Sequence, residues 1–345
     1  MTAWLAAIGG VATFCTPAHA HQAEESAAQS FELSLDTGQI AAIDERAITY
    51  YIDRPDMAGT FPILLVVDGS GCLGQRRPGF DRLYLPGANA ARPYARLRVE
   101  KPGVEAEAND LAAPCSDEFL KHYTMDNRVF DHLRVLQHLA AHAPWWNGEL
   151  LIWGWSDGGD VASQLVVYYP NVTRAVLGAA GGGYTMAEHF EDFWACPVEL
   201  GEGRDPCLAS IRADFTRMED NPTWTETWSG HDNSWRVWAS RLRTRLSAPL
   251  ADNQAPILLV HGALDRDATP VESTRKLVSD LDAAGNTAFT YWEVPAMHHG
   301  WSDLPPERQS ALMRGMQDWL LTGEVEPDDL ELIMEPGAGA PQSAS

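Results

Sequence analysis

One stretch of the sequence decides the predicted fold: Leu151-Ile152-Trp153-Gly154-Trp155-Ser156-Asp157-Gly158-Gly159. An apolar strand pattern runs into Gly-x-Ser-x-Gly, and a helical pattern with Val161, Ala162 and Ser163 follows directly. A serine on such a sharp strand-to-helix turn presents its hydroxyl outward, and the flanking glycines omit side chains that would clash. The N-terminus of the helix points its amides toward a developing oxyanion. The stretch therefore predicts Ser156 as a nucleophile.

The predicted nucleophile needs a histidine and an acid, because a serine at its ordinary pKa is a poor nucleophile. On a sheet of this kind the acid follows the serine in the chain and the histidine comes last. A buried-strand pattern runs into a loop that carries Asp265, with Asp267 as the alternative acid. The last strand pattern is followed by His299, directly before Gly-Trp, with His298 as the alternative base. We therefore predict a triad of Ser156, His299 and Asp265.

Backbone amides are expected to bind the oxyanion of the tetrahedral intermediate. The loop after the third predicted strand reads Asp68-Gly69-Ser70-Gly71-Cys72. The amide of Ser70 or Gly71 would donate to the oxyanion together with the amide of Asp157, directly after the nucleophile. This chemistry needs no cofactor, and the cysteine spacings, with no accompanying histidine cluster, do not predict a metal site.

The order of strand and helix patterns predicts an α/β protein with a mostly parallel sheet and helices on both faces. Strand patterns lie at residues 31–35, 47–52, 63–67, 95–99, 150–153, 175–177, 257–260 and 290–294. Helical patterns lie at residues 117–142, 159–169, 271–284 and 306–322. Residues 183–254 interrupt this alternation and contain several tryptophans. We interpret them as a lid inserted after the sixth strand, the alternative being an ordinary pair of surface helices.

Three motifs carry a resemblance to a known superfamily: Gly154–Gly158, His261–Asp265 and His299–Trp301. They resemble the α/β-hydrolase superfamily, in the neighbourhood of the prolyl oligopeptidase and dienelactone hydrolase-like branches. The similarity covers about residues 45–322. It implies the α/β-hydrolase fold and the activity of a serine hydrolase.

The sequence also departs from these branches. The loop after the third strand often reads His-Gly in them, whereas this chain has Asp68-Gly69. Dienelactone hydrolases proper use a cysteine nucleophile and haloalkane dehalogenases an aspartate, at the place where this chain has Ser156. Prolyl oligopeptidases resemble the chain only in their catalytic half, and the sequence ahead of that half is too short for their propeller domain.

The two ends of the chain are expected to lie outside the hydrolase domain, residues 21–322. The apolar stretch Trp4–Cys15 and the small-x-small site Ala18-His19-Ala20 predict a signal peptide at residues 1–20. The alternative is a disordered apolar leader. From residue 323 to 345 the chain is acidic and then rich in Gly, Pro and Ser, which predicts a disordered tail. We expect a periplasmic or secreted product.

The cysteine count agrees with export. Without the leader four cysteines remain, and an even set in an exported protein indicates two disulfides with three possible pairings. We predict the pairs Cys72–Cys115 and Cys196–Cys207.

Charge and composition limit the function further. The 345 residues carry a formal net charge of −23, which argues against nucleic acid and anionic membranes as partners. No membrane insertion is expected. Trp155, Trp228 and Trp235 are candidates for an apolar or aromatic substrate pocket. We therefore expect a hydrolase of small hydrophobic or aromatic carboxylic esters; the alternatives are a serine peptidase and a non-catalytic binding protein on a hydrolase scaffold.

Overall fold

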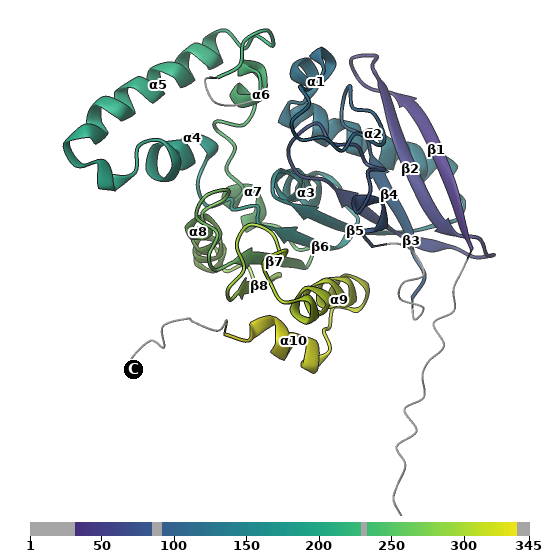
Figure 1. The fold of residues 1–345 in the computed structure, drawn as a ribbon. Helices are drawn as coiled ribbons and strands as arrows, with labels where there is room; N and C mark the ends of the chain where they lie inside the picture. Colours follow the sequence, from purple (N-terminus) through teal and green to yellow (C-terminus); the bar gives the residue numbers. More distant parts are fainter. Residues whose placement is uncertain (1–31, 85–91, 229–232, 337–345) are drawn as a thin grey trace, which may run out of the picture.

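The computed structural model describes residues 32–84, 92–228 and 233–336 (Figure 1). The predicted signal peptide and the last nine residues of the predicted tail lie outside these ranges. Eight strands of the described chain form one sheet in the order β1-β2-β4-β3-β5-β6-β7-β8. The strands are β1 Leu33–Ala41, β2 Ala47–Pro55, β3 Phe61–Val67, β4 Ala95–Val99, β5 Trp146–Trp155, β6 Val172–Gly178, β7 Ile257–Gly262 and β8 Phe289–Val294. Strands β3 to β8 are parallel to one another, whereas β2 is antiparallel to both β4 and the edge strand β1.

Helices cover both faces of the sheet, as the sequence predicts. One face packs against α2 Met125–His142, α3 Asp157–Tyr168, α7 Ser247–Ala251 and α8 Val271–Ala283. The other face packs against α9 Pro306–Thr322 and α10 Pro327–Met334. Successive side chains of a strand point to opposite faces, so Leu65 of β3 joins the first core and Val66 the second. Burial on both faces explains why the parallel strands are continuous apolar runs.

The predicted long helix at residues 117–142 is wrong in one respect, because the structure divides it into α1 Asp117–His122 and α2. The break lies at Tyr123 and Thr124. The Thr124 hydroxyl accepts a hydrogen bond from the Asn127 amide at 3.2 Å and caps α2. An N-cap threonine satisfies an amide that a continuous helix would bond to a carbonyl, which starts a new helix at this point.

Residues 183–254 form a helical insertion between β6 and β7. It contains α4 Met186–His189, the π-helix η2 Phe190–Trp194, the 3₁₀ helix η3 Val198–Gly203, α5 Arg204–Asp220, α6 Trp235–Ala239 and α7. Apart from α7, which joins the core of the sheet, these helices have a small core of their own built around Phe190, Phe215 and Trp238. Figure 1 shows α4 and α5 standing to one side of the sheet, beyond the ends of β5 and β6.

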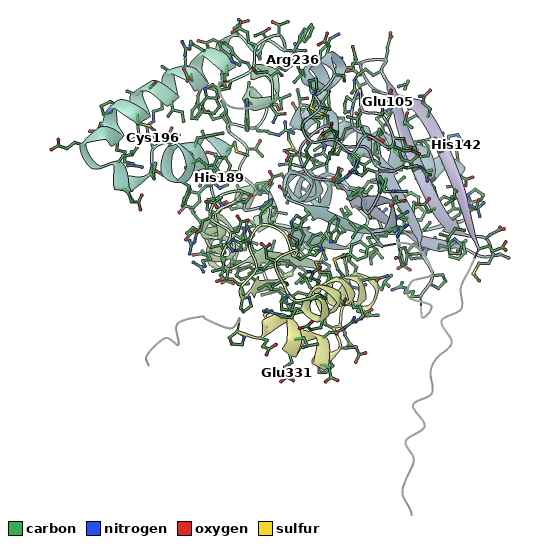
Figure 2. All side chains as sticks on the ribbon, viewed as in Figure 1. Glu105, His142, His189, Cys196, Arg236 and Glu331 are labelled. Atoms are coloured by element: carbon green, nitrogen blue, oxygen red, sulfur yellow. A yellow bond between two sulfur atoms is a disulfide. The ribbon has the colours of Figure 1, made fainter. Side chains whose placement is uncertain are left out.

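The predicted tail at residues 323–345 requires a correction, because α10 is an ordered helix within it. Ile333 of α10 is buried, and Arg308 of α9 donates to the carbonyls of Leu332 and Ile333. Arg314 of α9 also pairs with Asp329. Composition predicted disorder because this segment is acidic, whereas its apolar side chains join the same core as those of α9. Glu331 marks the position of α10 in Figure 2.

The structure contains both predicted disulfides, Cys72–Cys115 and Cys196–Cys207. The first joins the loop after β3 to the segment before α1, and the second closes a short loop of the insertion. No helix among the described residues is long and apolar enough to cross a membrane.

Candidate active site

Ser156 lies on a sharp turn between β5 and α3. Its backbone has φ 58° and ψ −131°, a conformation that costs energy for a residue with a side chain and is often found at functional sites. The glycines of the motif allow this turn. A Cβ on Gly154 would lie 2.3 Å from the Gly158 carbonyl oxygen, and one on Gly158 would lie 2.3 Å from the Val67 carbonyl oxygen. Only glycine therefore fits at both positions.

The predicted triad residues meet at the carboxyl ends of three strands. Ser156 follows β5, Asp265 follows β7 and His299 follows β8. The Nε2 atom of His299 lies 2.9 Å from Ser156 Oγ, and its Nδ1 atom lies 2.7 Å from Asp265 Oδ2. Because a carboxylate only accepts, Nδ1 carries the proton and Nε2 accepts from the serine hydroxyl. The alternatives His298 and Asp267 are exposed, and neither takes part in these contacts.

A second histidine, His261 at the end of β7, holds the acid in place. Its ring is fully buried; Nε2 lies 2.9 Å from the Thr269 carbonyl oxygen and 3.2 Å from Asp265 Oδ2. Both neighbours are acceptors, so Nε2 carries the proton, and Nδ1 accepts from the Thr274 hydroxyl at 2.7 Å. Burial alone would raise the pKa of Asp265, but hydrogen bonds from His261 and His299 hold it below its usual range. No role for His261 was predicted from the sequence, although the residue begins the motif His261–Asp265.

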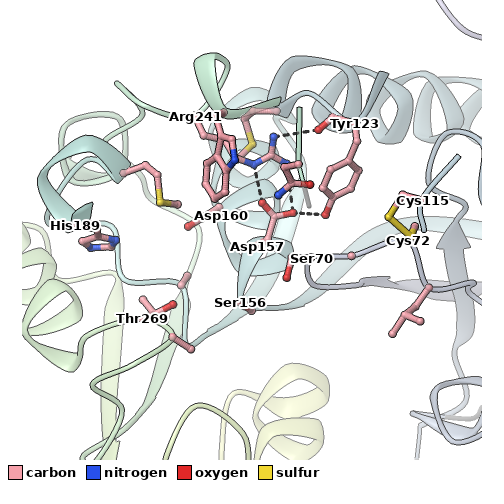
Figure 3. Close-up of a pocket in the computed structure, with 18 of the residues that line it drawn as sticks. Ser70, Cys72, Cys115, Tyr123, Ser156, Asp157, Asp160, His189, Arg241 and Thr269 are labelled. Atoms are coloured by element: carbon pink, nitrogen blue, oxygen red, sulfur yellow. Dashed lines mark hydrogen bonds and ion pairs between the residues drawn. A yellow bond between two sulfur atoms is a disulfide. The ribbon is translucent and has the colours of Figure 1, made fainter. Parts of the chain in front are cut away.

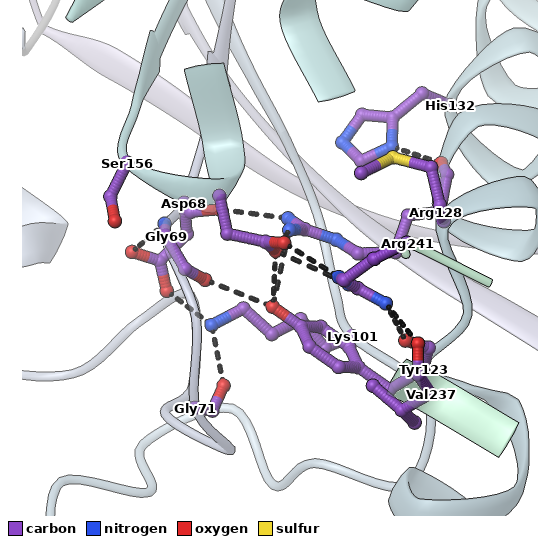
Figure 4. Close-up of polar contacts among 12 residues, drawn as sticks. Asp68, Gly69, Gly71, Lys101, Tyr123, Arg128, His132, Ser156, Val237 and Arg241 are labelled. Atoms are coloured by element: carbon purple, nitrogen blue, oxygen red, sulfur yellow. Dashed lines mark hydrogen bonds and ion pairs between the residues drawn. The ribbon is translucent and has the colours of Figure 1, made fainter. Parts of the chain in front are cut away.

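The loop that carries Ser70 and Gly71 is held by a buried charge network around Asp68 (Figure 4). Arg77 donates to both carboxylate oxygens of Asp68 at 2.9 Å, and the Lys101 ammonium lies 2.7 Å from the same carboxylate. Lys101 also donates to the Gly71 carbonyl at 2.7 Å. This network explains the departure from the His-Gly pattern: the aspartate binds two cations that fix the loop. The cavity beside Ser156 is lined by Ser70 and Gly71, the two predicted oxyanion donors of the loop.

Asp157, the third predicted oxyanion residue, begins α3, so its amide has no acceptor within the helix. Its buried side chain binds Arg128, accepts from Arg241 Nε at 3.0 Å and accepts from the Tyr123 hydroxyl at 2.6 Å. Burial would raise the pKa of Asp157, but the charges of Arg241 and Arg128 hold it below its usual range. The sequence alone did not reveal these partners, because they come from α2 and from the insertion.

The two networks together place positive charge beside the loop after β3 and at the start of α3, the two segments that carry the predicted oxyanion donors. Four cationic side chains surround two carboxylates there: Arg77, Lys101, Arg128 and Arg241 around Asp68 and Asp157. Fixed charges of this kind stabilise an oxyanion without having to reorganise during the reaction. Four cations thus gather around the loop after β3 and the start of α3 in a chain whose net charge is −23.

Ser156 opens on a cavity of about 730 Å³ between the loop after β3, α3 and the insertion (Figure 3). The predicted pocket tryptophans require a correction. Among the described residues that line the cavity are Trp194 and Trp238, but not Trp155, Trp228 or Trp235.

Each of the three packs elsewhere for a physical reason. Trp155 is buried, and its indole N–H donates to the His299 carbonyl at 2.9 Å, so it holds the backbone of the loop that carries His299. Trp228 packs against Phe190 and donates to Asp214 at 3.0 Å. Trp235 packs into the core of the insertion.

Comparison with known proteins agrees with this architecture. The sequence model of the prolyl oligopeptidase family matches residues 174–323. An acylaminoacyl peptidase in complex with Z-Gly-Gly-Phe-chloromethyl ketone aligns with TM-score 0.57 and 16% identity, over 87% of this chain and 44% of that one. A protein from Bacteroides ovatus described as a dipeptidyl aminopeptidase IV aligns with TM-score 0.53 and 15% identity, over 84% of this chain and 35% of that one.

A further structure, described as a dienelactone hydrolase from Klebsiella pneumoniae, aligns with TM-score 0.53 and 17% identity, over 84% of this chain and 99% of that one. The chain thus spans less than half the length of these two peptidases and nearly the whole length of the hydrolase. No curated protein sequence matches the chain. The fold is that of the α/β-hydrolases, and within it Ser156, His299 and Asp265 have the hydrogen-bonded arrangement that a serine hydrolase requires.

Proposed function

We propose that this serine hydrolase is a peptidase that cleaves short peptides through an acyl-enzyme on Ser156. One observation carries the proposal: Ser156 opens on a cavity of about 730 Å³ whose lining includes the polar side chains of Asp160 and His189. Such groups can bind the N–H and C=O groups of a peptide. The expectation of a hydrophobic ester rested in part on Trp155, Trp228 and Trp235 as pocket residues, and these three lie elsewhere. Similarity to the prolyl oligopeptidase family and to the acylaminoacyl peptidase supports a peptide substrate.

In the proposed reaction the Ser156 oxygen attacks the carbonyl carbon while its proton passes to His299 Nε2. The oxyanion accepts hydrogen bonds from the Asp157 amide and from that of Ser70 or Gly71. His299 then returns the proton to the leaving amine, and the C–N bond breaks. A water molecule, deprotonated by His299, releases the acid and regenerates the serine, while Asp265 stabilises the imidazolium.

The proposal is tested with peptide p-nitroanilides of one to four residues and p-nitrophenyl esters that carry the same acyl groups. We expect hydrolysis of at least one anilide, and loss of that activity together with fluorophosphonate labelling in Ser156→Ala. Hydrolysis of the esters with no turnover of any anilide would reject the peptidase and leave the esterase.

An esterase remains the second candidate because of one further observation. Met186, Trp194 and Trp238 form an apolar part of the cavity wall, which suits the acyl group of a small hydrophobic ester. The same triad cleaves esters and amides, so the ester series above also measures this activity.

We also propose that the protein is exported. The signal-peptide pattern at residues 1–20 and the two disulfides support this, since disulfides persist in oxidising compartments. N-terminal sequencing of the protein from the periplasm or medium should give a chain that begins near His21. Recovery of full-length protein with free thiols from the cytoplasm would contradict export.

A further inference from the structure

The helix that begins beside the nucleophile carries a carboxyl group that the triad does not use. Asp160 follows Ser156 by one turn of α3, about 6 Å along the helix axis, and lines the catalytic cavity. Within the described residues its side chain has no hydrogen-bond partner, whereas Asp157 in the same turn binds three. Burial, and then the charge of Asp157, raises the pKa of Asp160 well above its usual range.

A second unpaired group faces the same cavity from the insertion. His189 ends α4 and is only 4% exposed, yet neither ring nitrogen has a hydrogen-bond partner among the described residues. Burial lowers the pKa of His189 to about 4, so at neutral pH the ring offers one donor and one acceptor. Figure 3 shows Asp160 pointing from α3 toward the side of the cavity where His189 lies.

Buried polar groups without partners are costly, and at a site they indicate what a ligand supplies. The nearby cations are already engaged, because Arg128 and Arg241 bind Asp157. Asp160 therefore has no ion-pair partner among the described residues, and its raised pKa means that a bound cation is needed to hold the carboxyl group in its ionised form. A primary ammonium group has three N–H donors and no acceptor, which matches two carboxylate oxygens and one imidazole nitrogen. An anionic group at this place would be repelled by the carboxylates of Asp157 and Asp160, which share the first turn of α3.

We propose that Asp160 and His189 form an anchor for a primary ammonium group of the substrate. The anchor rests on the proposed function in one respect only, that Ser156 hydrolyses the bound molecule. The ammonium group lies between α3 and α4 while the scissile carbonyl lies at Ser156. One helical turn separates the two points, so the amine is one or two residues from the scissile bond. It comes either from a free N-terminus or from a lysine side chain.

The test compares kcat/KM for matched substrates: an unblocked aminoacyl or dipeptidyl compound, its N-acetyl derivative, and an N-acetyl-lysyl compound. Each is prepared as a p-nitroanilide and as an aryl ester. We expect the wild type to prefer the unblocked or the lysyl compound over an acetylated neutral one by roughly 10- to 100-fold, since a hydrogen bond to a charged group has this effect. A preference for the unblocked compound identifies a free N-terminus as the source of the amine, and a preference for the lysyl compound identifies a lysine side chain.

Asp160→Asn keeps the shape of the side chain and removes its charge. We expect it to abolish the preference by lowering kcat/KM for the amine substrates alone, and His189→Gln to weaken the preference less. Asp282→Asn, at an exposed position of α8, is the matched control and should change neither value.

If Asp160→Asn lowered kcat/KM equally for amine and acetylated substrates, the role of Asp160 would be purely structural and the anchor would be overturned. A wild-type preference for acetylated or succinylated compounds would overturn it without any variant. Because the preference is also measured on esters, the anchor is tested even if no anilide is cleaved, an outcome that rejects the peptidase alone.

Discussion

The sheet and the helical insertion contribute to the same cavity in different ways. The sheet holds the chemistry: Ser156, Asp265 and His299 stand at strand ends whose positions are set by backbone hydrogen bonds and two apolar cores. The insertion supplies His189 from the end of α4 and Arg241 from the turn after α6, and both segments adjoin a small aromatic core. The difference suggests that the fold positions catalysis, while recognition depends on a region that is less extensively packed.

The largest expected effect lies on the sheet side of this comparison. Ser156→Ala should lower turnover of any substrate by roughly 10⁴-fold or more, because the nucleophile is lost while the rest of the site remains. Steady-state kinetics and a thermal melt measure activity and folding separately. The control Ser310→Ala lies on α9, away from the cavity, and should keep full activity. Near wild-type turnover in Ser156→Ala would refute the assignment of the nucleophile.

The contact that joins the two regions should come next in size. Arg241→Met removes a buried arginine and leaves Asp157 with one fewer cation; breaking a buried pair costs about 3–5 kcal/mol, which is an upper bound here because Arg128 still pairs with Asp157. Arg243→Met is a close control, because Arg243 pairs with Glu219 at the exposed surface, where such a pair contributes about 0–1 kcal/mol. Denaturant unfolding measures both. Equal free energies of unfolding for the two variants would contradict a structural role for the buried pair.

The two disulfides allow a direct comparison of the regions. The bond beside the sheet spans 43 residues and that of the insertion spans 11. Loop-closure entropy then predicts that replacing Cys72 and Cys115 by alanine costs up to about 4 kcal/mol, and replacing Cys196 and Cys207 up to about 3 kcal/mol. Denaturant unfolding of each double variant under non-reducing conditions shows which disulfide contributes more to the free energy of unfolding. A larger loss for the insertion pair would show that packing, rather than loop length, sets the stability of that region.

The smallest effect concerns pH and one buried histidine in each region. Burial lowers the pKa of His132 on α2 to about 3 and that of His189 to about 4. The unfolded chain binds these protons near pH 6.5, so each histidine contributes stability above that pH, which is lost as the pH falls toward the folded-state pKa.

When the pH falls from 7 to 5.5, the protonation of each histidine in the unfolded chain should therefore lower the free energy of unfolding by about 1 kcal/mol. His132→Gln and His189→Gln should each remove their share of this pH dependence, whatever their effect at pH 7. Unfolding curves at several pH values measure the slope. A slope identical to that of the wild type in both variants would contradict the assignment.

The comparison also explains which sequence predictions succeeded. Strand periods and the Gly-x-Ser-x-Gly turn are local properties, so residues 151–159 were enough to predict the fold and the candidate nucleophile. Chain order then identified Asp265 and His299 as the triad partners of Ser156. The tryptophan pocket was wrong because an indole that packs in a core and one that lines a cavity have the same sequence signature.

The sequence by itself determined the α/β sheet, the serine on its turn, the order of the triad and an even set of cysteines. These features follow from hydrophobic period, glycine geometry and chain order, which act over a few residues or along the chain. The tertiary structure alone decided that Asp157 pairs with two arginines and that His261 holds Asp265. It also decided that Asp160 and His189 line one cavity, where neither side chain has a hydrogen-bond partner in the described part of the chain. Those properties depend on side chains brought together from distant elements, where burial and neighbouring charges set the pKa of each group.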